Sequence, residues 1–313
     1  MQKGLPELVV YLDGKFIKES EITFNWLDHI HRGYAVFDVA RTFNHKPFFW
    51  KEHIDRMYAS LRYAHIDAGM TPEEMYDVSW EVFKRNEDKL HPGDDFALLQ
   101  QVSAGVKSYY RGPTEKKQTV LINCGYLSPT YAKDAKRYKE GVPLVLANQR
   151  AYPPEALSGQ VKHASRMNLA LAEWEAHLIN PSAFVVMLDC RGFLTEGNGY
   201  NILWVKDGQL QLPTADSILP GVTQGVVLKL AKELGIDIAR GNYTSYDLYI
   251  ADEIFVTGNT PGIFAVNKFM DRDMPNVPGP VTKKLFDAYC QLIGVNLAER
   301  VQQVITYPKA AVK

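Results

Sequence analysis

The sequence predicts an α+β (α/β) protein of two domains. Its 313 residues are 46% hydrophobic and 23% charged, which is typical of a globular protein of two ordinary domains. Short apolar runs bounded by turn residues are mixed with helical patterns, without a regular βαβ repeat. We therefore expect a small α/β domain over residues 1–125, a polar interdomain linker over 126–141 and a large domain over 142–313.

The small domain begins with a predicted β-hairpin, because Asp13-Gly14 stands between the apolar runs 8–12 and 15–17. Apolar residues at helical spacing predict a helix over 53–62. A second helix is predicted to start at 71–74, where Thr caps, Pro takes the first position and Glu completes a capping box. Two strand-like runs follow, at 96–102 and 119–123.

The large domain contains a second predicted hairpin, at Asp207-Gly208. Its other elements follow from apolar runs and from helical spacing. They are strands at 144–147, 184–188 and 202–205, and helices at 168–178, 225–234 and 281–292.

Charge and cysteine content exclude several classes of protein. Lys+Arg 35 against Asp+Glu 36 leaves a net charge of -1, so the sequence has no electrostatic footprint for nucleic acid or an anionic membrane. Cys124, Cys190 and Cys290 are widely spaced and form no CxxC pattern. We expect buried, reduced thiols in a cytoplasmic protein, and no metal site.

Three segments indicate a specific chemistry. Lys162, in residues 159–168, and Glu196, in residues 194–201, suit an aldehyde cofactor held covalently by an amine, with a carboxylate against the nitrogen of its ring. The third segment, 219–223, turns directly into a predicted helix. A helix N-terminus offers unpaired N–H groups and a positive dipole end, so this segment predicts a phosphate site.

These segments, together with residues 251–258, resemble in the same order the signature segments of class IV (fold type IV) aminotransferases. The resemblance runs from about Val9 to Thr282. It implies pyridoxal 5'-phosphate as cofactor, bound in the cleft between two domains, with the large domain as the cofactor-binding one. The family includes branched-chain aminotransferases, D-amino-acid transaminases, (R)-amine transaminases and aminodeoxychorismate lyase.

The resemblance also implies roles for single residues. Lys162 would bind the cofactor covalently and carry the proton during the reaction, and Glu196 would pair with the ring nitrogen. The expected phosphate contacts are Arg56, Val222, Thr223, Asn259 and Thr260. For Arg56 the alternative is a solvated helix charge.

Substrate residues are harder to assign. Phe37 matches an aromatic residue that the family places beside the cofactor, although an ordinary core phenylalanine is equally compatible. Leu98 and Ala104 stand where relatives carry arginines that bind the substrate carboxylate. Three charged residues are candidate carboxylate anchors: Arg41, Lys107 and Arg111. Arg41 and Arg111 suit the role better than Lys107, since arginine can hold a carboxylate with two parallel bonds. Arg111 could equally be an exposed loop residue.

Three departures from branched-chain enzymes affect the expected specificity. Tyr200 and Gly262 are features of the (R)-amine branch. Met167 replaces a tyrosine that contacts the cofactor, and Arg166 is the candidate for its electrostatic role.

We expect a transaminase that passes an amino group from a hydrophobic amino acid or amine to a 2-oxo acid by a ping-pong mechanism. Its specificity would be of the branched-chain or the (R)-amine type. A D-amino-acid transaminase, a lyase acting on an aminochorismate-like substrate and a non-catalytic cofactor-binding protein are the alternatives. In this family a loop of a neighbouring subunit completes the pocket, which implies a homodimer or a larger symmetric assembly.

Overall fold

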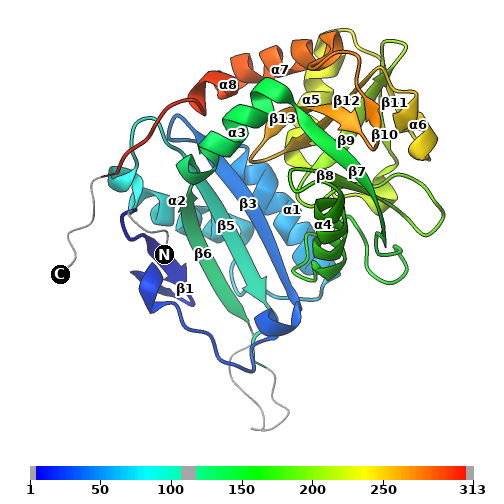
Figure 1. The fold of residues 1–313 in the computed structure, drawn as a ribbon. Coiled ribbons are helices and arrows are strands. Elements are labelled where there is room, and N and C mark those ends of the chain that lie inside the picture. Colours follow the sequence, from blue (N-terminus) through cyan, green and yellow to red (C-terminus); the bar gives the residue numbers. More distant parts are fainter. Residues whose placement is uncertain (1–4, 107–117, 308–313) are drawn as a thin grey trace. The chain divides into compact units, whose positions relative to one another are not determined.

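The computed structural model describes residues 5–106 and 118–307. The chain forms two compact units (Figure 1). The first unit comprises residues 5–130, 161–165 and 303–307 of the described chain, and the second comprises 131–160 and 166–302. Lys162 thus belongs to the first unit, although residues on both sides of its short segment belong to the second.

The first unit is built on a six-stranded antiparallel sheet with the strand order β2-β1-β6-β5-β3-β4. The predicted hairpin is confirmed, since Asp13 and Gly14 both have positive φ at the turn between β1 and β2. The strands are β1 (Val9–Leu12), β2 (Lys15–Lys18), β3 (Ala35–Phe43), β4 (Lys46–Phe48), β5 (Phe96–Ser103) and β6 (Thr119–Tyr126).

Helices α1 (Trp50–Tyr63) and α2 (Pro72–Lys84) pack on this sheet. The core between helices and sheet is apolar, with Met57, Phe83 and Phe96 fully buried. The predicted capping box at the start of α2 is confirmed: Thr71 Oγ1 accepts from the N–H of Glu74, and the Glu74 carboxylate accepts from the N–H of Thr71.

The second unit is built on an eight-stranded mixed sheet, in which β11-β10-β9-β12-β13-β7-β8 are neighbours and β14 pairs with β13. Its strands are β7 (Val142–Arg150), β8 (Phe184–Leu188), β9 (Asn201–Lys206), β10 (Gln209–Pro213), β11 (Ile238–Gly241), β12 (Glu253–Gly258), β13 (Gly262–Phe269) and β14 (Arg272–Asp273). The β7–β8, β7–β13 and β10–β11 pairs are parallel and the others are antiparallel.

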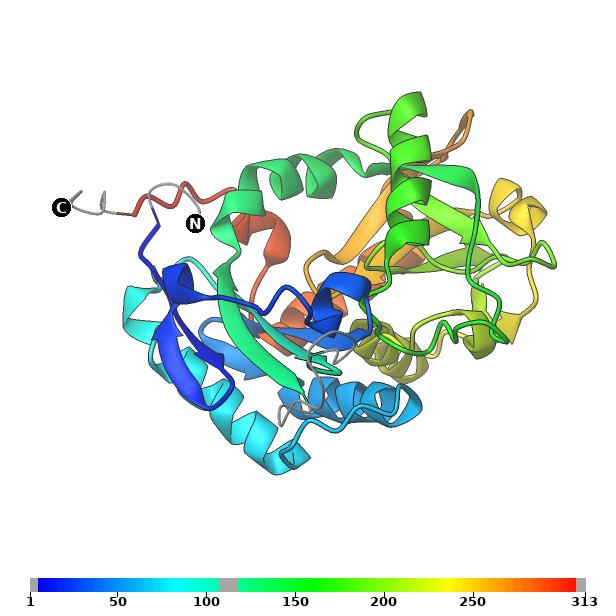
Figure 2. The same ribbon diagram turned by 90° about the horizontal axis from the view of Figure 1, so that it is seen from below.

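The helices of the second unit lie on both sides of its sheet. Figure 2 shows α4 alongside β7, and α5 and α7 contact β12. The helices are α4 (Met167–Ile179), α5 (Val222–Glu233), α6 (Ser245–Tyr249), α7 (Pro280–Ile293) and α8 (Leu297–Arg300). Within the described ranges, no helix is long and apolar enough to cross a membrane.

The structure differs from the sequence expectation at the segment 126–141. Most of it is a helix, α3 (Ser128–Glu140), and the division between the two units falls inside this helix, between residues 130 and 131. Only Tyr131 and Asp134 are buried in α3, so it has almost no apolar periodicity that a sequence pattern could reveal. Helix α5 also begins at Val222 and not at residue 225.

Candidate active site

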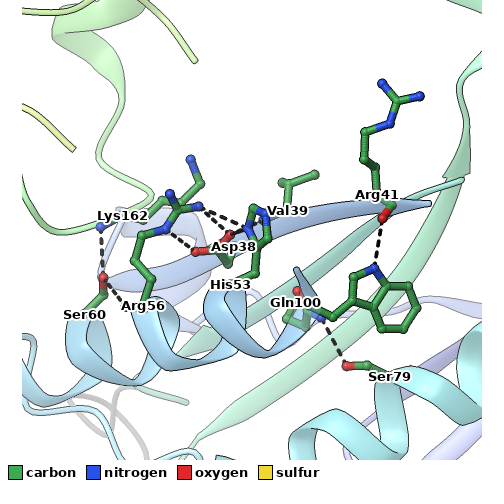
Figure 3. Close-up of polar contacts among 10 residues, drawn as sticks. Asp38, Val39, Arg41, His53, Arg56, Ser60, Ser79, Gln100 and Lys162 are labelled. Atoms are coloured by element: carbon green, nitrogen blue, oxygen red, sulfur yellow. Dashed lines mark hydrogen bonds and ion pairs between the residues drawn. The ribbon is translucent and has the colours of Figure 1, made fainter. Parts of the chain in front are cut away.

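The backbone of Lys162 is fixed on both sides. Its carbonyl accepts from the N–H of Phe37 on β3 at 3.0 Å, and its N–H donates to Ser60 Oγ on α1 at 3.1 Å (Figure 3). The residue is only 9% exposed, and its amine lies 4.9 Å from the centre of the Phe37 ring. The predicted lysine is therefore a buried residue of a loop that is hydrogen-bonded to β3 and α1, and its amine lies beside the predicted aromatic residue.

Helix α1 presents His53, Arg56 and Ser60 on one face, because residues three and four apart are neighbours on a helix. Arg56 is not a solvated charge, since its side chain is 10% exposed. Its Nε and Nη2 donate to the Asp38 carboxylate at 2.9 and 2.7 Å (Figure 3). Burial opposes ionisation of Asp38, but the Arg56 charge and the His53 bond hold its pKa well below the usual range.

Alternation along β3 separates two groups of side chains. Asp38 faces α1, whereas Phe37, Val39 and Arg41 share the opposite face, where the Lys162 amine lies. Arg41 is buried, its Nε donates to Thr42 O at 3.2 Å, and its guanidinium lies 4.0 Å from the centre of the Phe43 ring. In Figure 3 it extends away from α1.

Leu98 and Arg111 are two further positions that the sequence connects with the substrate carboxylate. Leu98 is fully buried in the core with α1 and α2, because it pairs with Ala40 on the helix-facing side of the sheet. The residue of β5 that shares the face of Val39 is Leu99, its cross-strand partner. Arg111 lies outside the described residues.

In the second unit, Asn201 joins the segment of Glu196 to the segment 219–223. Its amide donates to the Glu196 carboxylate at 2.8 Å and to Leu219 O at 3.0 Å. The N–H of Leu219 donates to the same Glu196 oxygen at 3.0 Å. A Cβ on Gly221 would lie 2.1 Å from Asn201 Oδ1, so this turn requires glycine. Glu196 and the predicted phosphate turn are therefore held as one group.

The start of α5 has the donors that a phosphate needs. Val222 is its first residue, and the N-cap Gly221 has no side chain to satisfy the first N–H groups. Thr223 is buried beside it. Two buried atoms, Gln224 Nε2 and Thr257 Oγ1, have no hydrogen-bond partner among the described residues. Gln224 is in the first turn of α5, and Thr257 is the cross-strand partner of Asn201. This donor set fits a bound phosphate group.

Asn259 and Thr260 lie directly after β12, in the turn to β13. Asn259 is half-buried and Thr260 is exposed. The structure thus places both at the end of the strand that carries Thr257.

Arg166, the candidate for the electrostatic role of the missing tyrosine, is close enough to Glu196 to interact with its charge. Its Nη2 donates to Asn198 Oδ1 at 3.3 Å, and Asn198 donates to Glu173 at 2.8 Å. Burial lowers the pKa of Arg166 and the Glu196 charge opposes that shift. Met167 is 73% exposed.

The two features of the (R)-amine branch have packing explanations. The Tyr200 hydroxyl donates to Val185 O at 3.0 Å and accepts from Val185 N at 2.6 Å. Its ring covers Gly197, where a Cβ would lie 2.1 Å from it. Gly262 has a φ of 58°, in the left-handed region that favours glycine. Because packing and backbone conformation explain both residues, neither is evidence for an amine substrate.

Two of the three cysteines are at least partly buried, but Cys190 is exposed, which corrects the expectation for that thiol. It follows Asp189 in a polar turn that is closed by Arg191, so no apolar element covers it. In the part of the chain that the structure describes, no group of three or more His, Cys, Asp or Glu side chains could hold a metal ion.

The Amino-transferase class IV family matches residues 35–269. A putative branched-chain-amino-acid aminotransferase from Methanocaldococcus jannaschii is 35% identical over 285 residues, which cover 90% of this chain and 94% of that protein. The branched-chain-amino-acid aminotransferase of Escherichia coli strain K12 is 24% identical over 287 residues, or 90% of this chain and 91% of that protein.

Solved structures agree in fold. The branched-chain aminotransferase of Thermoproteus uzoniensis with norvaline has a TM-score of 0.81 at 24% identity and covers 92% of this chain and 95% of its own. The T.th. branched-chain aminotransferase complexed with N-(5'-phosphopyridoxyl)-L-glutamate has a TM-score of 0.80 at 24% identity. The match covers 97% of this chain and 100% of that one. The chain therefore belongs to the class IV aminotransferases, which are pyridoxal 5'-phosphate-dependent transaminases of fold type IV.

Proposed function

We propose that this transaminase moves an amino group from a hydrophobic amino acid to a 2-oxo acid, with branched-chain-type specificity. The relative from Methanocaldococcus jannaschii, named a putative branched-chain-amino-acid aminotransferase, supports this substrate class. The two substrates use one pocket in turn, which gives ping-pong kinetics.

The observation that carries the proposal is the apolar surface beside Lys162. Phe37, Val39 and Leu99 share one half-buried face of the first sheet, and the Lys162 amine lies over the Phe37 ring. An aliphatic side chain placed against this face would remove apolar area from water, at about 25 cal/mol per Å². A polar side chain would gain nothing there. The face therefore favours leucine, isoleucine or valine.

We assign the cofactor contacts as follows. Bound pyridoxal 5'-phosphate supplies an electron sink next to the carbon that loses its proton. Lys162 holds the cofactor covalently and moves the proton, and Glu196 keeps a proton on the ring nitrogen. Arg56, Val222, Thr223, Asn259 and Thr260 bind the phosphate, and Gln224 and Thr257 are further donors in the same region.

For the substrate carboxylate we propose Arg41 and Arg111. Arg41 supports this role because it lies on the same face of β3 as Phe37 and Val39. Its guanidinium can form two parallel bonds to a carboxylate, which fixes the substrate backbone relative to the apolar face.

Titration of the holoenzyme with three amino donors tests the substrate class. We expect L-leucine to remove the visible absorbance of the bound cofactor at lower concentration than D-alanine or (R)-phenylethylamine. If D-alanine is the best donor, the enzyme is a D-amino-acid transaminase. If (R)-phenylethylamine is the best donor, the enzyme is an (R)-amine transaminase. Pyruvate release from an aminochorismate-like substrate without an amino acceptor would instead show a lyase.

We further propose a homodimer, supported by the exposed face of α4. Met167, Leu171, Trp174 and Leu178 follow a four-three-four spacing along the helix and are 73, 44, 60 and 68% exposed. Side chains of this size expose on the order of 100 Å² each, so together with Ile179 they offer more than half of the ~800 Å² that each partner buries in a standard interface.

The charges of α4 favour a second copy over a membrane as the occupant. The helix contains no Lys or Arg, and its two acids are used internally: Glu173 accepts from Asn198, and Glu175 accepts from the N–H groups of Asn148 and Gln149. An uncharged row with heptad-like spacing can pack against itself across a two-fold axis. We also propose a cytoplasmic location, since all three cysteines are free thiols.

A further inference from the structure

We infer that Asp38 is the positioning residue of the phosphate site: it fixes the Arg56 guanidinium and so sets the affinity for the phosphate of the cofactor. This inference rests on the proposed role of Arg56. It concerns a residue on the side of β3 that faces away from the Lys162 amine, so Asp38 acts through Arg56 and not by contact with the substrate.

Asp38 is surrounded by donors. It is fully buried, and its oxygens accept from Val39 N at 2.7 Å, His53 Nδ1 at 2.7 Å, Arg56 Nε at 2.9 Å and Arg56 Nη2 at 2.7 Å (Figure 3). A buried carboxylate is stable only when it is paired and hydrogen-bonded in this way. The donors come from β3 and from α1, so Asp38 also joins these two elements.

The two bonds from Arg56 determine an orientation. Guanidinium is planar, so two parallel bonds along its Nε–Nη2 edge fix both the plane and the direction of the group. The opposite edge, which carries Nη1, then points away from Asp38. A single bond, or a lysine in place of Arg56, would leave the charge free to rotate.

His53 supports the carboxylate from the other side. It is 2% exposed, and burial lowers its pKa, so the imidazole is neutral at pH 7. Since Asp38 is ionised, His53 Nδ1 carries the proton and donates it. Asp38 and Arg56 therefore form a pair whose charges cancel, and the value of the pair for phosphate binding is directional and not a matter of net charge.

The test compares two cofactor forms that differ only in the phosphate. Dissociation constants for pyridoxal 5'-phosphate and for pyridoxal are measured by absorbance on the full chain, stripped of cofactor and titrated. For Asp38→Asn we expect the constant for pyridoxal 5'-phosphate to rise about 10- to 100-fold, the range for losing groups that orient a ligand-binding side chain. The constant for pyridoxal should change by less than about threefold.

Asp55→Asn is the matched control, because Asp55 lies next to Arg56 on α1 but is exposed and pairs with Lys51 at 3.2 Å. It should change neither constant. In a chain that already carries Arg56→Lys, Asp38→Asn should not raise the dissociation constant for pyridoxal 5'-phosphate any further. Asp38→Glu, which displaces the charge by one methylene, gives the same selective loss if the Asn variant does not fold.

An equal rise for both forms in Asp38→Asn and Asp38→Glu would show that Asp38 is merely structural and would overturn the inference. So would unchanged binding of the phosphate form. If the unsubstituted chain binds neither form, the proposed function itself fails. One further outcome would keep the proposed function but reject the role of Asp38. In it, Arg56→Lys weakens binding of pyridoxal 5'-phosphate and not of pyridoxal, whereas Asp38→Asn in the otherwise native chain changes neither dissociation constant.

Discussion

Asn201 holds two functional segments together with one amide group. It donates to both Glu196 and Leu219, which is 18 residues further along the chain. Alanine at this position would leave the Glu196 carboxylate with a weaker set of donors and Leu219 O without its side-chain partner. A hydrogen bond to a charged group contributes roughly 1.5–3 kcal/mol.

We therefore expect Asn201→Ala to lower kcat by about 10- to 100-fold, since each 1.36 kcal/mol is worth about a factor of ten in rate. Steady-state kinetics with saturating cofactor would measure it. Asn242→Ala, at an exposed asparagine of the same unit, is the control and should leave kcat unchanged. A kcat within twofold of the native value in Asn201→Ala would show that catalysis does not depend on the bonds from Asn201 to Glu196 and Leu219.

Arg41→Gln separates substrate binding from cofactor binding. If Arg41 anchors the carboxylate, the variant should raise the KM of amino acids about tenfold or more and leave the KM of simple amines unchanged. The same measurement on Arg111→Gln decides between the two candidates. A rise in KM for amines and amino acids alike would show that the arginine is structural.

The residues proposed to take part in chemistry follow from the sequence, whereas the residues proposed to act through others do not. Lys162 and Glu196 are candidates because a covalent cofactor demands an amine and a carboxylate in recognisable segments. Asp38 and Asn201 act through Arg56 and Glu196, and that relation depends on how β3 pairs with α1 and on where segment 219–223 folds back. The spacing of residues along the sequence does not predict either contact.

Helix α1 gives the first unit a dependence on pH. Burial lowers the pKa of His53, and Arg56 together with His53 lowers that of Asp38 in spite of its burial. A group whose pKa is lower in the folded state stabilises that state above its unfolded pKa, and this contribution disappears as the pH falls through the folded pKa. For His53 the loss begins near its unfolded pKa of about 6.5, and for Asp38 only below about 4.

We expect the free energy of unfolding to decrease from pH 7 to pH 5, with at most about 1.4 kcal/mol per pH unit arising from His53. Urea denaturation at both pH values measures this. In His53→Asn that part of the slope should be absent, whereas His65→Asn, at an exposed histidine of the same unit, should keep it. Equal slopes in the native chain and in His53→Asn would refute the assignment.

Strands and helices with a strong pattern were predicted well, and α3 was not. Both Asp-Gly hairpins, the α2 capping box and the strands β5 to β9 that carry apolar runs are confirmed. Helix α3 has two buried residues in thirteen, so tertiary contacts define it, such as Tyr138 donating to Pro261 O at 2.6 Å. Its helical form is supported by Asp134–Arg137 and Lys136–Glu140 pairs on its surface.

The family, the fold type and the dependence on pyridoxal 5'-phosphate were predicted from four short segments and are confirmed. The grouping of residues 161–165 with the first unit could not be predicted, because it comes from bridging of Val36 with His163, far apart in sequence. The proposed homodimer is supported by the exposed apolar face of α4, which only the structure reveals.

For the assembly we expect the native chain to sediment as a dimer and a Trp174→Glu/Leu178→Glu variant to sediment as a monomer. Two carboxylates at these positions would have to be buried without partners on each subunit. Tyr246→Glu, at a residue of α6 that is 66% exposed, is the control and should leave the dimer intact. A dimer that survives both glutamates would place the interface elsewhere.

Lys162 is the residue proposed to carry the cofactor. The most direct measurement is borohydride reduction of the holoenzyme, followed by proteolysis and mass spectrometry of the lysine peptides. We expect the mass of the reduced cofactor on the peptide containing Lys162, and we expect Lys162→Ala to carry no label and to have no transaminase turnover. Label on a different lysine, or full turnover of Lys162→Ala, would contradict it.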